Sequence, residues 1–165
     1  MRRMQLDGDL DLWELDSKGD AGFSSGGFMS DIKTNGQVDS GTQQQWLTRN
    51  SEFATWKGSN WNDVFLGSVN APESHCGNTD GLPYTTIEKT PLIAEKPYIT
   101  EKDGKFTLNV PNVETDKVGV TAEYNNAVQV DFENVFVASE RNTATEITAK
   151  LDQGMHVVLQ PGNYK

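Results

Sequence analysis

Short apolar pieces recur through the first half of the chain, with polar turns between them. They lie at residues 28–32, 46–47 and 64–66, and Gly, Ser, Asn and Asp fill the stretches that separate them. Their spacing of roughly 18 to 22 positions, without helices in between, is typical of the stacked coils of a parallel β-solenoid. A β-sandwich predicts strands about every 8 to 12 residues. The longer interval favours the solenoid.

The first residues alternate between apolar and polar positions, which predicts a half-buried strand over residues 4–12. Its apolar face holds Met4, Leu6, Leu10 and Leu12. On the other face, the spacing of Asp7, Asp9 and Asp11 resembles the first ligand positions of an EF-hand calcium loop. Such a loop needs Gly where Leu12 stands and Glu where Lys18 stands, so the strand interpretation is preferred.

The middle of the chain differs from the first part in composition and in its strand pattern. Residues 70–86 have the composition of a loop, and residues 87–139 contain further strand patterns. An Asp103-Gly104 turn precedes an alternating strand at 106–110, and other strands are predicted at 118–122 and 128–137. We expect a β-rich linker that packs on the solenoid.

One helix is predicted near the C-terminus. Thr143 and Glu146 form a capping box, and Gly154 stands where a helix places its C′ residue. Ala144, Ile147 and Leu151 would form the apolar face. A strand at 156–159 and a Pro-Gly turn follow at once, as expected if the helix caps the end of a new β-stack.

Length and charge narrow the classes of partner. The chain has 165 residues, the size of one ordinary domain, and a net charge of −10. Nucleic acid and anionic membranes are unexpected partners because both require a basic patch. The longest apolar run is too short to span a membrane. The apolar run of a signal peptide is not found after the first arginines. The first predicted strand has no turn or cap residues before it, and nothing follows the last strand and turn to cover them, so we expect a fragment of a longer protein.

No cofactor or metal is predicted. His75 stands next to Cys76, the single cysteine, but zinc needs three or four ligands and no further Cys or His lies near in sequence. The sequence also lacks the glycine-rich patterns that bind phosphates and dinucleotides. A neutral ligand is therefore the natural expectation.

The segment from Ser40 to Ser68 is the strongest functional signal. It concentrates amide and indole side chains, the groups that hydrogen-bond to sugars and stack on them. The candidate substrate-binding residues are Gln43, Gln45, Trp46, Arg49, Trp56, Trp61 and Asn62. The tryptophans serve equally well as cover for the core, and for Arg49 an ion pair with Glu52 or Asp63 is preferred to a binding role.

Residues 143–164, TATEITAKLDQGMHVVLQPGNY, resemble the entry unit of right-handed parallel β-helices in the pectate-lyase-like superfamily. The order of parts along the chain is similar to family 55 glycoside hydrolases of the exo-β-1,3-glucanase type. The resemblance implies an all-β fold: late coils of a first right-handed parallel β-helix in 1–86, a linker in 87–139 and the start of a second β-helix in 140–165. It also implies an extracellular protein that acts on a polysaccharide such as β-glucan.

The same resemblance implies a catalytic role for two residues. In that family a Gln and a Ser on neighbouring coils hold the attacking water, and the general acid comes from the second β-helix. Gln44 and Ser68 are 24 positions apart, about one coil, so we expect them to stack, with Gln43 or Gln45 in place of Gln44 after a register slip. The acid would then lie beyond Lys165, in the rest of the protein's own chain.

Two other classes of function stay open. A non-catalytic glycan-binding β-helix predicts the same fold and exposed tryptophans, without a water site shared by Gln and Ser. A purely structural solenoid predicts that residues 43–45 form an amide ladder that stabilises the stack.

Overall fold

The structure is a computed structural model that describes residues 1–75, 81, 83–121 and 126–164. The chain divides into two compact units. One comprises Met1–Ile93 with Glu114–Glu123, and the other comprises Ala94–Val113 with Tyr124–Lys165. Each unit therefore contains residues that are distant in sequence. Among the helices of the described ranges, none is long and apolar enough to cross a membrane.

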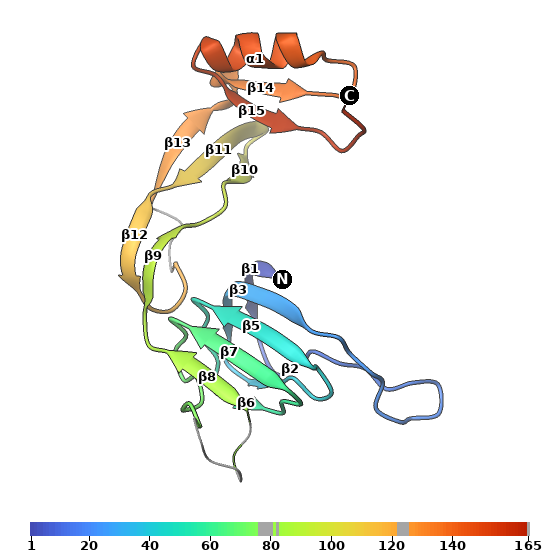
Figure 1. Ribbon diagram of the computed structural model, residues 1–165. Helices are drawn as coiled ribbons and strands as arrows, with labels where there is room; N and C mark the ends of the chain where they lie inside the picture. Colours follow the sequence, from blue (N-terminus) through green and yellow to red (C-terminus); the bar gives the residue numbers. More distant parts are fainter. Residues whose placement is uncertain (76–80, 82, 122–125, 165) are drawn as a thin grey trace. The chain divides into compact units, whose positions relative to one another are not determined.

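The first unit is a parallel β-solenoid (Figure 1). Its larger sheet has five parallel strands in the order β1 (Arg2–Leu6), β3 (Gly27–Thr34), β5 (Gln45–Arg49), β7 (Asn62–Leu66) and β8 (Tyr84–Ile87). Residues that form hydrogen bonds between neighbouring coils are 17, 19 or 28 positions apart in sequence. The β-helix fold predicted from the spacing is thus confirmed.

A smaller parallel sheet forms a second face of the coils. It contains β2 (Leu10–Asp11), β4 (Gln37–Asp39) and β6 (Thr55–Lys57). The prediction of a single strand over 4–12 is wrong, because the chain turns from one sheet to the other at Gly8, whose φ is +111°. Glycine adopts such an angle without steric cost, and the alternating pattern continues across the corner.

Apolar and aromatic side chains from successive coils fill the interior. The core comprises Met29, Ile32, Val38, Trp46, Phe53 and Phe65. Phe65 lies at the centre of an aromatic cluster, with its ring centroid 4.8 Å from that of Trp56 and 5.9 Å from that of Tyr84. Burial of these apolar and aromatic side chains stabilises the stack.

One corner of the solenoid is built from residues in the left-handed region. Arg3, Asp31, Asn50 and Gly67 have φ values of 49°, 57°, 46° and 58°, and the strand register places them on successive coils. Residues 117–121 return to cover this corner. The backbone N–H of Gly119 donates to the carbonyl of Gly67 at 2.8 Å, and that of Thr121 donates to Asp31 Oδ1 at 2.8 Å.

This returning segment differs from the prediction. The strand is β12 (Val113–Lys117), which pairs with β9 (Thr90–Ala94), and residues 118–121 are irregular. The strand predicted at 118–122 is therefore wrong for 118–121, and residue 122 lies outside the described residues. Amides of this segment bond to the corner of the solenoid, in place of a neighbouring strand.

The second unit begins with a hairpin of β10 (Tyr98–Lys102) and β11 (Lys105–Pro111). Asp103 and Gly104, with φ values of 52° and 76°, make its turn as predicted. β13 (Ala127–Asp131) adds to β11 in antiparallel orientation. The single strand predicted at 128–137 is two strands, because a 3₁₀ turn at Phe132–Asn134 separates β13 from β14 (Val135–Ala138).

The predicted helix is confirmed as α1 (Ala144–Asp152). Thr143 and Glu146 form both bonds of the capping box, and Gly154 follows the C-cap with a φ of +78°. β15 (His156–Leu159) then pairs in parallel with β14, so α1 connects two parallel strands. The predicted apolar face of α1 is only partly covered, since Leu151 is exposed.

Candidate functional site

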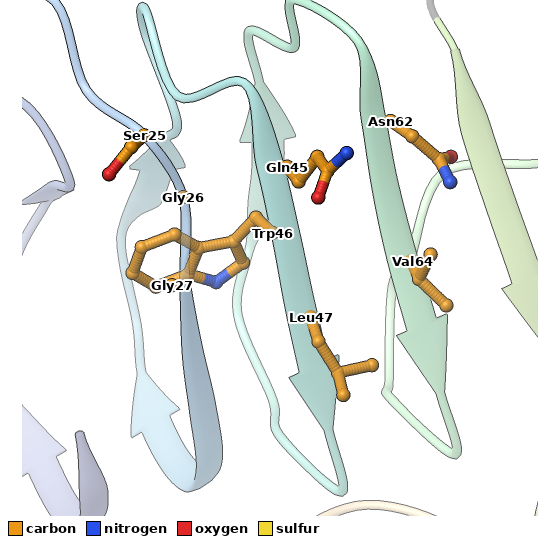
Figure 2. Close-up of a pocket in the computed structure, with 8 residues that line it drawn as sticks. All are labelled: Ser25, Gly26, Gly27, Gln45, Trp46, Leu47, Asn62 and Val64. Atoms are coloured by element: carbon orange, nitrogen blue, oxygen red, sulfur yellow. The ribbon is translucent and has the colours of Figure 1, made fainter.

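A pocket of about 390 Å³ lies on the larger sheet of the solenoid, where β3, β5 and β7 begin (Figure 2). The residues that line it are Ser25, Gly26, Gly27, Gln45, Trp46, Leu47, Asn62 and Val64. Parallel pairing brings them together from three coils, since Gly27 is opposite Trp46 and Gln45 is opposite Asn62. We call this site the amide pocket.

Two glycines make one side of the amide pocket. A Cβ on Gly27 would lie 2.4 Å from Cζ3 of Trp46, and a Cβ on Gly26 would lie 2.2 Å from the carbonyl oxygen of Gln45. Gly26 also has a φ of +117°. The indole of Trp46 reaches across toward Gly27 in Figure 2. Only residues without a side chain allow β5 to approach this closely.

The other side carries two exposed amides. Gln45 and Asn62 lie on neighbouring strands, with the apolar side chains of Leu47 and Val64 beside them (Figure 2). None of the eight described residues that line the pocket is charged. Amides donate and accept hydrogen bonds, and apolar side chains contact C–H groups, so the arrangement suits a neutral molecule rich in hydroxyl groups.

The three tryptophans of the segment have different roles. Trp46 is buried, with 9 % of its surface exposed, and belongs to the core. Trp56 points inward, where its Nε1 donates to Asp63 Oδ2 at 3.0 Å. Trp61 is 58 % exposed and directly precedes Asn62 of the pocket. Among them, only Trp61 has a surface available as a sugar platform, and the core interpretation holds for Trp46 and Trp56.

Gln43 and Gln44 hold the coils together. The buried Gln43 side chain accepts from the N–H of Gly26 at 2.8 Å and donates to the carbonyl of Leu12. Gln44 uses its backbone, which donates to Ser24 and accepts from Trp61 and Asn62, each at 3.1 Å. The amide run 43–45 thus has one structural side chain, Gln43, and one that faces the pocket, Gln45.

Gln44 and Ser68 do not meet. β5 and β7 pair with Gln45 opposite Asn62 and Arg49 opposite Leu66, so Gln44 precedes one end of the pair and Ser68 follows the other. The five residues of β7 lie between the two positions and separate them by about 16 Å at about 3.3 Å per residue. The expected stacking of these residues is wrong, because the coil here is 17 residues long and the prediction assumed 24.

Ser68 lines a different cavity. This cavity of about 490 Å³ also contains Glu73 and Glu88. The Ser68 Oγ accepts from the backbone N–H of Ser51 at 3.4 Å, a weak bond that ties it to the preceding coil. This cavity thus contains two carboxylates, from Glu73 and Glu88, whereas the amide pocket has no charged residue in its described lining.

Arg49 lies on the outer side of β5, beside Phe28. Its guanidinium carbon is 5.5 Å from the ring centroid of Phe28, within the range of a cation–π contact, and that of Arg2 is 4.7 Å from the same ring. Of the two acids expected near Arg49, Glu52 pairs with Lys33 at 2.9 Å and Asp63 bonds to Ser40 and Trp56 inside the solenoid.

The interior also holds the carboxyl group of Asp63, which the sequence analysis considered only as a surface partner of Arg49. Asp63 is fully buried, and its Oδ2 accepts hydrogen bonds from Ser40 Oγ and Trp56 Nε1, both at 3.0 Å. Burial raises the pKa of Asp63 despite these two bonds. The signal was present, because alternation places Asp63 on the same face of β7 as Phe65.

No group of three or more His, Cys, Asp or Glu residues that could hold a metal occurs in the part of the chain that the structure describes. Of the His75–Cys76 pair considered above, Cys76 lies outside that part.

Comparison with known proteins gives a clear relative. The chain is 33 % identical over 167 residues to an exo-beta-1,3-glucanase of Streptomyces sp. (strain SirexAA-E / ActE). The chain is homologous to one segment of this glucanase. The match covers 99 % of the chain and 26 % of the relative, so the chain spans about a quarter of the relative's length. No protein-family model matches the chain.

Solved structures from the same Streptomyces strain are also similar to this chain. The structure of sacteLam55A from Streptomyces sp. SirexAA-E superimposes with a TM-score of 0.85 at 32 % identity, covering 99 % of this chain and 29 % of that one. A variant of sacteLam55A in complex with glucose gives a TM-score of 0.82 at 31 % identity, with the same coverage. The resemblance to family 55 glycoside hydrolases that the sequence predicted is confirmed.

Proposed function

We propose that this chain is part of a protein that binds and hydrolyses β-1,3-glucan, and that the amide pocket is a glucan-binding site. The observation that carries the proposal is an uncharged pocket with two exposed amides, Gln45 and Asn62, on a chain homologous over nearly its whole length to an exo-beta-1,3-glucanase. The exposed indole of Trp61 beside Asn62 supports it, because an aromatic ring stacks on the apolar face of a sugar.

The amide pocket binds without catalysing. Glycoside hydrolysis generally needs two carboxyl groups, one of them a general acid, and the described lining of this pocket contains neither Asp nor Glu. The resemblance to family 55 glycoside hydrolases implies a general acid from the second β-helix, and we propose that it lies beyond these 165 residues. A water held jointly by Gln44 and Ser68 forms no part of the proposal, because the strand register separates them. An extracellular location, where glucans are met, is part of it.

The absence of an acid from the described lining of the pocket also favours a second candidate, a glycan-binding β-helix that does not hydrolyse its ligand. Both functions use the amide pocket in the same way. They differ in whether a longer chain that contains these residues releases sugar from β-1,3-glucan.

Binding of β-1,3-linked glucose oligomers to the 165-residue chain, measured by calorimetry, tests the site. We expect Gln45→Ala and Asn62→Ala each to weaken binding about five- to tenfold, since each removes a hydrogen-bonding partner worth about 1 kcal/mol. Gln129→Ala, which removes an exposed amide from the other unit, is the matched control. The chain should release no sugar by itself. Absence of binding, or equal affinity in all three variants, contradicts the proposal.

A further inference from the structure

A second aromatic residue stands beside the amide pocket. Phe23 is fully exposed, and it lies two positions before Ser25, which lines the pocket on the side opposite Trp61. We propose that Phe23 is a second stacking platform of the glucan site, so that the ligand lies across three coils from Phe23 to Trp61. This inference rests on the proposed function and adds a residue and a minimum ligand length to it.

Backbone hydrogen bonds place Trp61 and Ser24, the residue after Phe23, on either side of Gln44. Gln44 N donates to the carbonyl of Ser24, the neighbour of Phe23, and the carbonyl of Gln44 accepts from Trp61 N, both at 3.1 Å. Ser24, Gln44 and Trp61 are thus adjacent on three successive coils. Two strand spacings separate the outer coils, about 10 Å in all.

The backbone on both sides of Phe23 is fixed. The carbonyl of Gly22 accepts from Thr42 Oγ1 of the next coil, and the Gly22 N–H donates to the carbonyl of Glu14 at 3.0 Å. Ser24 forms a parallel bridge with Gln43. An aromatic ring with two torsions on an anchored backbone loses little conformational entropy when a ligand binds, which makes an exposed phenylalanine useful as a platform.

The chemistry of the surroundings selects a neutral sugar chain. The phenyl ring of Phe23 has no polar atom, so it contributes contact with the C–H face of a sugar, whereas Gln45 and Asn62 supply hydrogen bonds between the two rings. The net charge of −10 disfavours an acidic polysaccharide. A separation of about 10 Å between coils exceeds the length of one sugar ring, so the site requires an oligomer.

Calorimetric titration of the 165-residue chain with glucose, a β-1,3-linked disaccharide and a longer β-1,3-linked oligomer tests this inference. Phe23→Ala should weaken binding of the longer oligomer about five- to tenfold and leave glucose binding unchanged. Phe23→Trp should retain the affinity because it preserves the stacking surface. Leu15→Ala is the control, since it removes an exposed apolar side chain from the same loop.

The outcomes separate the two proposals. If Phe23→Ala binds the longer oligomer as the wild type does, whereas Gln45→Ala is weakened, the second platform is refuted and the glucan site stands. A loss that Leu15→Ala shares equally assigns the effect to the loop rather than to the Phe23 ring, and this also refutes the inference. If the wild-type chain binds none of the sugars, the proposed function fails first.

Discussion

Trp56 and Asp63 are seven residues apart in sequence and meet inside the solenoid, where the indole Nε1 donates to the carboxyl Oδ2 at 3.0 Å. Ser40 Oγ donates to the same oxygen at 3.0 Å. The buried carboxyl group of Asp63, the residue after Asn62 of the amide pocket, thus connects Ser40 of one coil with Trp56 of the next. Such a group stabilises the fold as an acceptor of two hydrogen bonds, and its ionisation in the interior opposes this.

Replacement of Asp63 separates these two effects. Asp63→Ala leaves the donors of Ser40 and Trp56 without an acceptor and should lower the free energy of unfolding by about 1–3 kcal/mol. Asp63→Asn keeps an acceptor oxygen and removes the ionisable group. We expect it to be at least as stable as the wild type near neutral pH, measured by urea unfolding. A loss equal to that of Asp63→Ala would contradict this interpretation.

The pH dependence of stability provides a second test of Asp63. Burial raises its pKa in the folded state above the ordinary value of 3.8, so the folded protein keeps this proton to a higher pH than the unfolded chain. The contribution of Asp63 to stability is therefore lost as the pH rises from about 3.8 through the raised pKa. The advantage of Asp63→Asn should be small in acid and grow toward neutral pH. The opposite trend is incompatible with a raised pKa.

Tyr84 should titrate unusually late. Burial, followed by the charges of Asp63 and Asp39, raises its pKa from 10.0 to about 12. Because the folded state holds the phenolic proton more tightly than the unfolded state, the contribution of Tyr84 to stability falls as the pH rises from 10.0 to about 12. Ultraviolet absorbance should show a tyrosine that ionises near pH 12 and is missing in Tyr84→Phe. An unchanged alkaline titration in that variant would assign the late group elsewhere.

The sequence predicts the repeating elements of this fold well, because their pattern is local. Strand spacing indicates the parallel coils, and the capping box of Thr143 and Glu146 indicates α1. Corners are harder to predict. The alternation of residues 4–12 continues past Gly8, where only a positive φ reveals that the chain changes sheets.

The site shows the same limit. The composition of residues 40–68 indicates a polar surface, and Gln45, Trp61 and Asn62 prove to lie at or beside the pocket. Which of the neighbouring side chains face inward depends on the strand register. Coil length varies between 17 and 28 residues, so counting along the chain misplaces Gln44 relative to Ser68. No sequence pattern marks Phe23, because its place in the solenoid depends on contacts of Gly22 and Ser24 with residues distant in sequence.

Gly27→Ala should disturb both stability and binding. The added methyl group would lie 2.4 Å from Trp46 Cζ3, so the indole has to move within a packed core, at a cost of about 1–3 kcal/mol. We expect a lower midpoint of urea unfolding and weaker binding of glucan oligomers. In a Trp46→Leu background the ring is absent, and Gly27→Ala should cost less. Equal costs in both backgrounds would show that the contact with Trp46 is unimportant.

The left-handed corner at Asp31 should control how residues 117–121 attach to the solenoid. Asp31 has a φ of +57°, and its Oδ1 accepts from the Thr121 N–H at 2.8 Å. Asp31→Asn keeps the acceptor oxygen, and asparagine tolerates this backbone conformation, whereas Asp31→Ala loses both properties. We expect Asp31→Ala to lower the free energy of unfolding by about 1–3 kcal/mol and Asp31→Asn to cost less.

Hydrogen exchange distinguishes this attachment from a general loss of stability. In Asp31→Ala the Thr121 amide should exchange faster than in the wild type by a larger factor than the amides of β5, because its acceptor has been removed. Asp31→Asn should keep most of its protection, although it loses the contact between Asp31 Oδ2 and Arg3 Nε, which are 3.7 Å apart. If both variants release Thr121 equally, the charge pair with Arg3 holds the corner and the Oδ1 acceptor does not.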